Sequence, residues 1–237
     1  MTPSLKKRFW KTVSVRESDA GFAVFLDQHQ LMTPAKAALL VPTRALADAI
    51  AGEWRAQSEK VDPATMPMTR RANAAIDKVA PQHSEVADLL AAYGGTDLVC
   101  YRATHPVELI DRQAAIWDPV LDWAVAELGV ELAVTSGVMH VDQRVGDLAK
   151  LHRMVHEMDA FKLAGFHDLV AVSGSLLIAF MVIRNARPIG DLWPVSRVDE
   201  DWQAELWGAD DEAADTAKRK QAEFEAAHRF FGLVDTR

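Results

Sequence analysis

Residues 22–57, FAVFLDQHQLMTPAKAALLVPTRALADAIAGEWRAQ, carry the densest structural signals in the chain and decide how its N-terminal part folds. A short apolar run at 22–26 is interrupted by the polar residues 27–30 and resumes at 37–41. Two apolar runs separated by a polar, turn-forming segment are typical of a β-hairpin. This stretch offers few groups suited to catalysis, and it therefore favours a protein that works by holding another protein.

A helix is expected directly after the hairpin. Thr43 is a suitable N-cap, and Leu46, Ile50 and Trp54 fall on one helical face at steps of four. Trp54 then either anchors the core or lines a groove. A core position is favoured because a buried indole contributes a large apolar area to folding.

The composition is that of an ordinary globular protein and excludes some functions. The chain has 237 residues, of which 49% are hydrophobic and 25% charged, with a net charge of -8. Binding to nucleic acid is not expected, because a duplex-binding surface needs clustered cations to displace counterions from phosphates. The single cysteine, Cys100, excludes an internal disulfide and fits a reducing compartment.

Targeting and membrane signals are weak. The N-terminal MTPSLKKRFWK is positively charged but lacks the apolar run of a secretory signal, so a cytoplasmic protein is expected. The most apolar stretch, residues 169–183, is shorter than the roughly 20 residues of a membrane-spanning helix. A buried central helix without membrane insertion is the better interpretation, and Gly174 would let neighbouring helices approach closely.

The pattern along the chain predicts an α+β fold in two domains. Residues 1–62 form a small strand-rich domain and residues 63–237 a larger, mainly helical one, with the prolines at 63 and 67 near the boundary. Helices are expected at 70–79, 84–93, 106–128, 145–163, 166–184, 196–207 and 212–231. Residues 97–101 and 130–134 have the composition of short strands, although a helical fragment is an alternative for the first.

One histidine pair is a candidate metal site. His152 and His156 lie four residues apart, on one face of the expected helix, and Asp159 follows one turn later. Position 153 is Arg, where the zinc-protease motif H-E-x-x-H has its glutamate. Surface or interhelical histidines are the favoured interpretation. We therefore expect no catalytic, cofactor-binding or metal-binding residues, and a metal-dependent hydrolase using His152 and His156 stays as an alternative.

An acidic stretch at 199–215, DEDWQAELWGADDEAAD, contains no lysine or arginine and is interrupted by Trp202 and Trp207. One interpretation is a solvated helix face followed by an acidic start to the next helix. The other is a docking surface, since large aromatic residues anchor a partner while carboxylates attract its basic groups. A general acidic adaptor protein is therefore a further alternative.

Several short motifs of the chain are specific and are not general fold patterns. They are Leu31 to Pro34, Glu53-Trp54 with Gln57, Cys100-Tyr101-Arg102, Gln113 with Trp117-Asp118-Pro119, and Trp207-Gly208. Through these motifs the chain, from about Phe9 to Trp207, resembles a known family, the assembly chaperones of the F-type ATP synthase alpha subunit. This family is called ATP synthase assembly factor 2 in mitochondria and is also found in alpha-proteobacteria.

The resemblance implies a non-enzymatic chaperone that binds the free alpha subunit and covers its interface until the beta subunit assembles. It implies no cofactor, and we expect a monomer when the protein is free. An acidic position important in the family aligns best with Glu200. Arg55 departs from the family pattern, in which Asp often follows Glu-Trp. The partner-binding residues expected on this basis are Glu200, Asp199, Asp201, Trp202, Trp207, Glu53 and Trp54.

Overall fold

The computed structural model describes residues 7–208 and 210–235. The N-terminal residues 1–6, where no targeting signal is expected, Ala209 in the acidic stretch and the last two residues lie outside this range. The fold is α+β, as the sequence predicts, with an antiparallel sheet followed by helices.

The described chain divides into two compact units, treated separately below. The first comprises residues 7–83, 160–165 and 229–235, and the second comprises 84–159 and 166–228. The first unit thus extends beyond the expected domain boundary at residue 62. It also includes the first residues of α6 (Ala160–Ser173) and the last of α10 (Asp211–Asp235).

An antiparallel sheet built around one central strand forms one layer of the first unit. Strand β2 pairs with all three neighbours, and the predicted hairpin is confirmed by the pairs Phe22 with Val41 and Ala23 with Leu40. The strands are β1 (Val13–Ser18), β2 (Gly21–Leu26), β3 (His29–Gln30) and β4 (Leu40–Val41).

The polar residues 27–30 do more than interrupt the apolar run. Asp27 turns the chain with a positive φ of 55°, and His29 and Gln30 return as β3. The Asp27 carboxylate accepts hydrogen bonds from the backbone N–H groups of Lys11 (3.1 Å) and Thr12 (2.8 Å). These bonds hold the pKa of Asp27 below its usual value and fix the turn against the start of β1.

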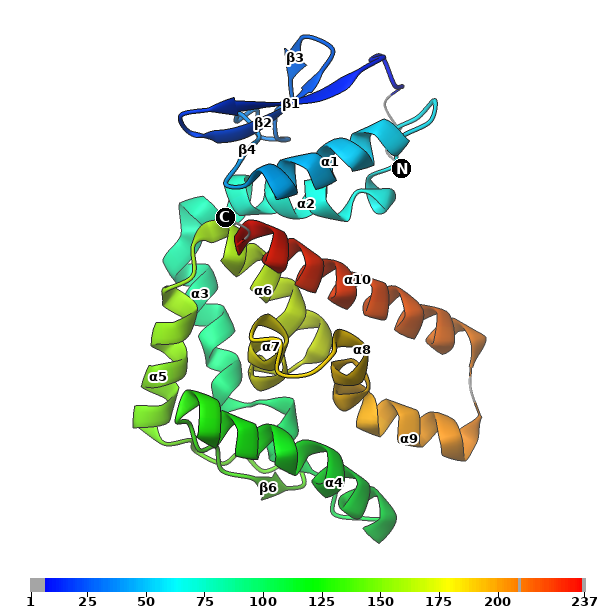
Figure 1. Ribbon diagram of the computed structural model, residues 1–237. Helices are drawn as coiled ribbons and strands as arrows, with labels where there is room; N and C mark the ends of the chain where they lie inside the picture. Colours follow the sequence, from blue (N-terminus) through cyan, green and yellow to red (C-terminus); the bar gives the residue numbers. More distant parts are fainter. Residues whose placement is uncertain (1–6, 209, 236–237) are drawn as a thin grey trace. The chain divides into compact units, whose positions relative to one another are not determined.

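Helix α1 (Arg44–Ala56) contacts β1, β2 and β4 of the sheet (Figure 1). Thr43 caps it as predicted, accepting from the N–H of Leu46 at 3.1 Å, while its hydroxyl donates to the Leu233 carbonyl at 2.6 Å. Leu46 and Ile50 are fully buried. Trp54 is half-buried and meets Trp10 edge to face, with 5.1 Å between ring centroids.

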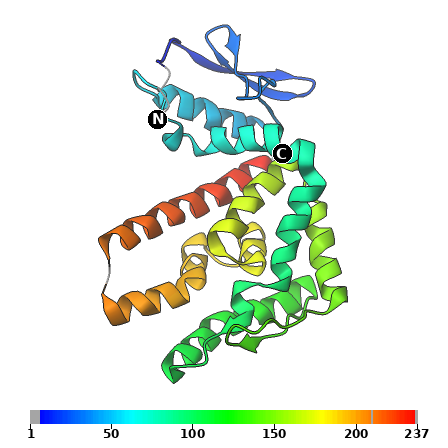
Figure 2. The same ribbon diagram turned by 180° about the vertical axis from the view of Figure 1, so that it is seen from behind.

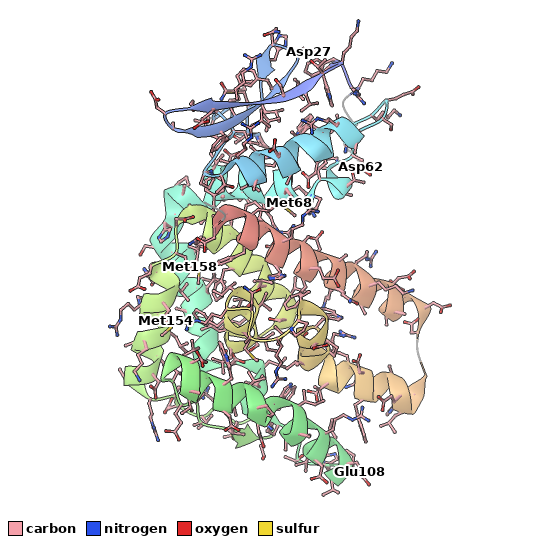
Figure 3. The ribbon with its side chains drawn as sticks, in the orientation of Figure 1. Asp27, Asp62, Met68, Glu108, Met154 and Met158 are labelled. Atoms are coloured by element: carbon pink, nitrogen blue, oxygen red, sulfur yellow. The ribbon has the colours of Figure 1, made fainter. Side chains whose placement is uncertain are left out.

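Glu53 on α1 and Gln57, the residue just after its end, hold the segment that follows the helix. The Glu53 carboxylate accepts from the N–H of Met68 (2.6 Å) and from the N–H and hydroxyl of Thr69 (2.8 and 2.6 Å). With these bonds Glu53 caps the start of α2 (Pro67–Ala74). The Gln57 side chain accepts from the N–H of Asp62 (2.7 Å) and donates to Thr65 (3.0 Å). Asp62 and Met68 mark the two ends of this segment in Figure 3.

The second unit is mainly helical. Its short strands β5 (Tyr101–Arg102) and β6 (Thr135–Ser136) pair in parallel, so regular strand structure occupies only the end of the expected stretch at 97–101 and lies just past 130–134. Helices α3 and α5 lie side by side in both views (Figures 1 and 2). The helices of this unit, besides parts of α6 and α10, are α3 (His83–Ala91), α4 (Val107–Trp123), α5 (Val145–His156), α7 (Leu176–Ile183), α8 (Ile189–Leu192) and α9 (Val198–Trp207).

The apolar helix expected at 166–184 is in fact two helices. Gly174 has a φ of +72°, which ends α6, and Ser175 caps α7 by accepting from the N–H of Ile178 at 3.0 Å. The buried Asp97 accepts from the Ser175 hydroxyl at 2.7 Å and the Leu177 N–H at 3.0 Å. Burial raises the pKa of Asp97 above its ordinary value. Within the described ranges, no helix is long and apolar enough to cross a membrane.

Replacing Glu53 with Ala should destabilise the protein by about 2 kcal/mol, because three donors at the start of α2 lose a charged acceptor. Urea denaturation followed by circular dichroism measures the change. Glu17→Ala, at an exposed position on β1, is the control and should shift the midpoint little. Equal midpoints for the two variants would show that the cap contributes nothing.

Candidate functional site

The acidic helix α9 offers the best candidate surface for binding a partner. We define the α9 surface as Asp199, Glu200, Asp201, Trp202, Leu206 and Trp207. Within α9 only Val198 is buried. Asp199, Glu200 and Asp201 all lie in its first turn, where carboxylates interact favourably with the positive end of the helix dipole.

Helix α4 holds the start of α9 through Gln113, which is almost fully buried. The Gln113 amide N–H donates to the Asp199 carboxylate at 2.6 Å, and its carbonyl accepts from the N–H of Ala103 at 2.7 Å. One turn along α4, the indole N–H of Trp117 donates to the Val195 carbonyl at 2.7 Å. Gln113 and Trp117, both from the motifs named above, therefore fix the segment that leads into α9. The carboxylate of Asp199 is used in a hydrogen bond within the protein.

Arg112 covers the middle of α9. Its guanidinium makes two hydrogen bonds of 2.8 Å with the Glu205 carboxylate and lies 4.8 Å from the centre of the Trp202 ring. The ion pair lowers the pKa of Glu205. Trp202 is thus half-buried beneath an arginine rather than presented as a free aromatic anchor.

Arg197 interacts with the remaining acids of the first turn. It lies 3.0 Å from Glu200 and 3.7 Å from Asp201, at the helical spacings of three and four residues. The Glu200 carboxylate nevertheless stays half-exposed. Glu200 and Asp201 therefore present negative charge to solvent from positions that Arg197 holds in place.

Large apolar side chains are exposed at the end of α9. Trp207 is 85% exposed and Leu206 60%. Gly208, with a φ of +90°, then ends the helix. Tryptophan is among the residues enriched at the energetic centre of protein interfaces, whereas carboxylates are more typical of the polar rim around it.

Glu53 and Trp54, also expected to bind a partner, have structural partners in the first unit. The Glu53 carboxylate caps α2, and Trp54 packs on Trp10. Arg55, which departs from the family pattern, donates to the Val13 carbonyl of β1 at 3.3 Å. The side chains at this end of α1 are therefore used in contacts within the first unit.

The Cys100-Tyr101-Arg102 motif is also structural. Arg102 is buried, donates to the Val99 carbonyl at 2.9 Å and pairs with Asp118 at 2.8 Å. Burial, reinforced by the charge of Asp97, raises the pKa of the Cys100 thiol to about 12. The thiol therefore stays protonated at neutral pH and is a poor nucleophile.

The histidine pair is brought together with a carboxylate that the sequence did not indicate. His152 and His156 both contact Asp88 of α3, and among the described residues this trio is the group that could hold a metal ion. The expected third member, Asp159, is not part of it. Asp88 lies 64 residues from His152 along the chain, so no local spacing could have revealed it.

The sequence interpretation did not identify Arg112 and Arg197, the two arginines that contact the candidate α9 surface. Arg197 precedes Glu200 and Asp201 at helical spacing, and that local signal could have identified it. Arg112 meets Glu205 across a separation of 93 residues, which only the fold reveals.

Comparisons with known proteins agree on one family. The family profile described as ATP12 chaperone protein matches residues 7–125. The crystal structure of Atp12 from Paracoccus denitrificans is 46% identical, covers 96% of this chain and 98% of its own, and superposes with a TM-score of 0.93. A mutant of that protein with one aspartate changed to lysine has the same identity and TM-score, covering 96% of this chain and 97% of its own.

A structure from a second bacterium is equally similar in fold. Atu1473, a candidate chaperone from Agrobacterium tumefaciens, is 37% identical, with a TM-score of 0.94. It covers 98% of this chain and 87% of its own. The similarity therefore extends over both compact units.

Replacing Gln113 with Met, which has similar volume but cannot replace the amide hydrogen bonds, should cost about 2 kcal/mol of stability. The N–H of Ala103 and the carboxylate of Asp199 would lose their partner in a largely buried position. Urea denaturation measures the loss. Gln203→Met, at an exposed position on α9, serves as the matched control; an equal effect of both substitutions would contradict the assigned role of Gln113.

Cys100 should be inert in the folded protein, since its thiol is buried and its pKa is raised to about 12. A thiol-reactive dye should label native protein far more slowly than protein unfolded in urea. Because Cys100 is the single cysteine, the signal needs no correction for other thiols. Labelling of native protein as fast as the unfolded control would show that the site is accessible.

Proposed function

The chain belongs to the ATP12 chaperone family, and from this membership we propose that it binds the free alpha subunit of the ATP synthase catalytic head. In this role it covers the surface of the alpha subunit that later meets the beta subunit. An unpaired subunit exposes an apolar interface that otherwise associates with itself. A chaperone that occupies this interface prevents aggregation until assembly.

The observation that best supports a binding role is the α9 surface. It combines exposed carboxylates at Glu200 and Asp201 with the exposed apolar side chains of Leu206 and Trp207. The apolar residues supply area that is lost from water on binding, and the carboxylates attract a basic patch and orient it. We propose that Glu200 and Trp207 make the principal contacts with the alpha subunit.

Contacts within the second unit hold the α9 surface in place before any partner arrives. Gln113 binds Asp199, Arg197 binds Glu200 and Arg112 binds Glu205. A surface ordered in advance loses less conformational entropy on binding. Asp199 and Trp202 support the α9 surface through contacts with α4. Glu53 and Trp54 lie in the first unit, where they make structural contacts.

This proposal assigns no catalytic residue and no cofactor, in keeping with a chaperone family. It places a monomeric protein in the cytoplasm, without a nucleic-acid partner or membrane insertion. A general acidic adaptor would also use an acidic and aromatic surface. The two functions differ in the partner, which affinity capture from native extract identifies directly.

The test is co-expression of the alpha subunit with the wild-type chain, Glu200→Lys or Glu85→Lys, followed by affinity capture. Glu85 is an exposed residue on α3, and its substitution makes the same change in charge. We expect wild type and Glu85→Lys to keep the alpha subunit soluble and in a complex. Glu200→Lys should weaken binding by about tenfold or more, because a cation replaces an anion at the contact.

Two results would count against the proposal in different ways. An alpha subunit that stays aggregated beside the folded wild-type chain would contradict the chaperone function itself. Equal affinity of Glu200→Lys and wild type would remove Glu200 from the contact while leaving the function in place. Circular dichroism of each variant checks that the fold is intact.

A further inference from the structure

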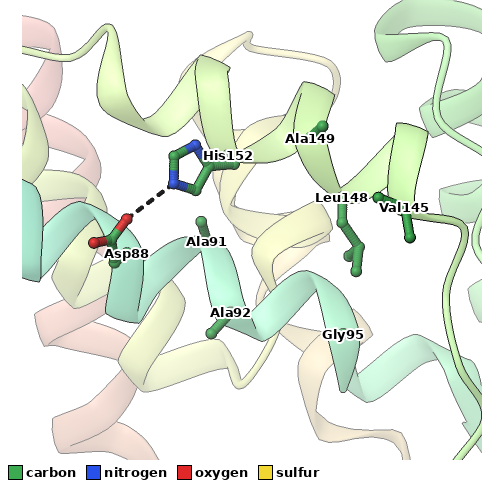
Figure 4. Close-up of a pocket in the computed structure, with 8 residues that line it drawn as sticks. All are labelled: Asp88, Ala91, Ala92, Gly95, Val145, Leu148, Ala149 and His152. Atoms are coloured by element: carbon green, nitrogen blue, oxygen red, sulfur yellow. Dashed lines mark hydrogen bonds and ion pairs between the residues drawn. The ribbon is translucent and has the colours of Figure 1, made fainter.

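Two helices of the second unit bring a pair of imidazoles onto one carboxylate. His152 and His156 lie one turn apart on α5, and the Nε2 atom of each contacts the same oxygen of Asp88 on α3, at 2.9 and 2.8 Å. The two rings stack with centroids 4.0 Å apart and planes inclined by 23°. Figure 4 shows His152 directed from α5 toward Asp88 on α3.

This arrangement is close to the geometry of a metal site. The three ligand atoms all lie within 4.8 Å of one another. A zinc ion about 2.0–2.1 Å from each ligand separates its ligand atoms by roughly 3.3 Å. The two separations between Asp88 and the imidazoles, 2.8 and 2.9 Å, need to grow by only about half an ångström, which rotation of the half-exposed Asp88 side chain can provide. The third separation, between the two histidine nitrogens, lies within the 4.8 Å limit and is adjusted by the histidine rotamers.

We propose that Asp88, His152 and His156 form a binding site for a divalent transition-metal ion of the zinc class that bridges α3 and α5. Two imidazole nitrogens and one carboxylate oxygen suit zinc and its neighbours better than magnesium or calcium, which prefer oxygen alone. The ion takes the place of the two contacts that now join the imidazoles to the carboxylate, and each neutral imidazole binds it through Nε2. The site thereby joins two helices with bonds stronger than the hydrogen bonds it replaces.

The surroundings leave room for further ligands. A groove of about 490 Å³ runs beside the cluster, with Asp88 and His152 in its lining and otherwise small or apolar residues such as Ala91 and Leu148. One or two water molecules can complete the coordination from this side or from bulk solvent. The apolar lining supplies no competing charged group.

Two positively charged residues of α5, Lys150 and Arg153, lie near the cluster in sequence. Lys150 is directed elsewhere, to Asp147 at 3.1 Å. Arg153 follows His152 directly and precedes His156 by three residues, so it lies beside His156 on the helix surface. Its side chain is exposed to solvent, where repulsion between like charges is screened.

A metal bound here stabilises the folded chain, because the three ligands come together only in the native structure. Binding to the native state alone raises the melting temperature in proportion to the logarithm of the ion concentration over its dissociation constant. The role is structural and separate from the α9 surface. It adds a property that is independent of the proposed alpha-subunit binding.

The test is titration of the metal-stripped full chain with Zn²⁺ by calorimetry, and with Co²⁺ followed by visible absorption. We expect one ion per chain and a rise in melting temperature with Zn²⁺. His152→Ala and Asp88→Asn should each weaken binding by about 100-fold or more, since each removes a direct ligand. His140→Ala is the matched control: His140 also lies beside a carboxylate, Asp142 at 3.3 Å, but has no second histidine in a cluster of this kind among the described residues.

The outcomes separate a built site from adventitious binding. Loss of the Co²⁺ spectrum and of the Zn²⁺-induced stabilisation in His152→Ala and Asp88→Asn, with both kept in His140→Ala, supports the site. Asp88→Asn tests the site even if removal of a histidine loosens α5, because Asn is nearly isosteric with Asp. The proposed site would be overturned if wild type showed no saturable binding of Zn²⁺ or Co²⁺. It would also be overturned if wild type and both ligand variants bound these ions equally.

Discussion

The buried amide of Gln113 is the contact on which the arrangement of the candidate site depends. Its carbonyl holds the backbone at Ala103 and its N–H group holds the carboxylate of Asp199, so one side chain on α4 joins two segments far apart in sequence. An amide is suited to this because it offers a donor and an acceptor in one plane. The start of α9 is fixed by this contact, and the acids that follow are presented from a defined position.

The most specific motifs of the chain turn out to build the scaffold. Glu53 caps α2, Gln57 closes the loop before it, and Trp117 binds the backbone at Val195. Such residues tolerate little substitution because a buried polar group without its partner is costly. The residues that we propose to meet a partner are exposed ones, above all Glu200 and Trp207. The sequence indicated both, Glu200 by its place in the acidic stretch and in the family resemblance, and Trp207 by the Trp-Gly motif.

The sequence predicted local structure well and long-range contacts poorly. The hairpin at 22–41 and the cap at Thr43 follow from turn and capping chemistry within a few residues, and both are confirmed. The break at Gly174 was missed because an apolar run does not distinguish one buried helix from two. Asp88 could not be assigned to the histidine pair, because such contacts depend on how helices pack rather than on spacing.

The central claim is that α9 meets the alpha subunit while the residues of α1 serve the scaffold. Amide hydrogen exchange of the chain, measured alone and in complex with the alpha subunit, tests both halves at once. The account predicts slower exchange on binding across Val198–Trp207 and unchanged exchange across Arg44–Ala56. Unchanged exchange at α9, with new protection along α1, would contradict it.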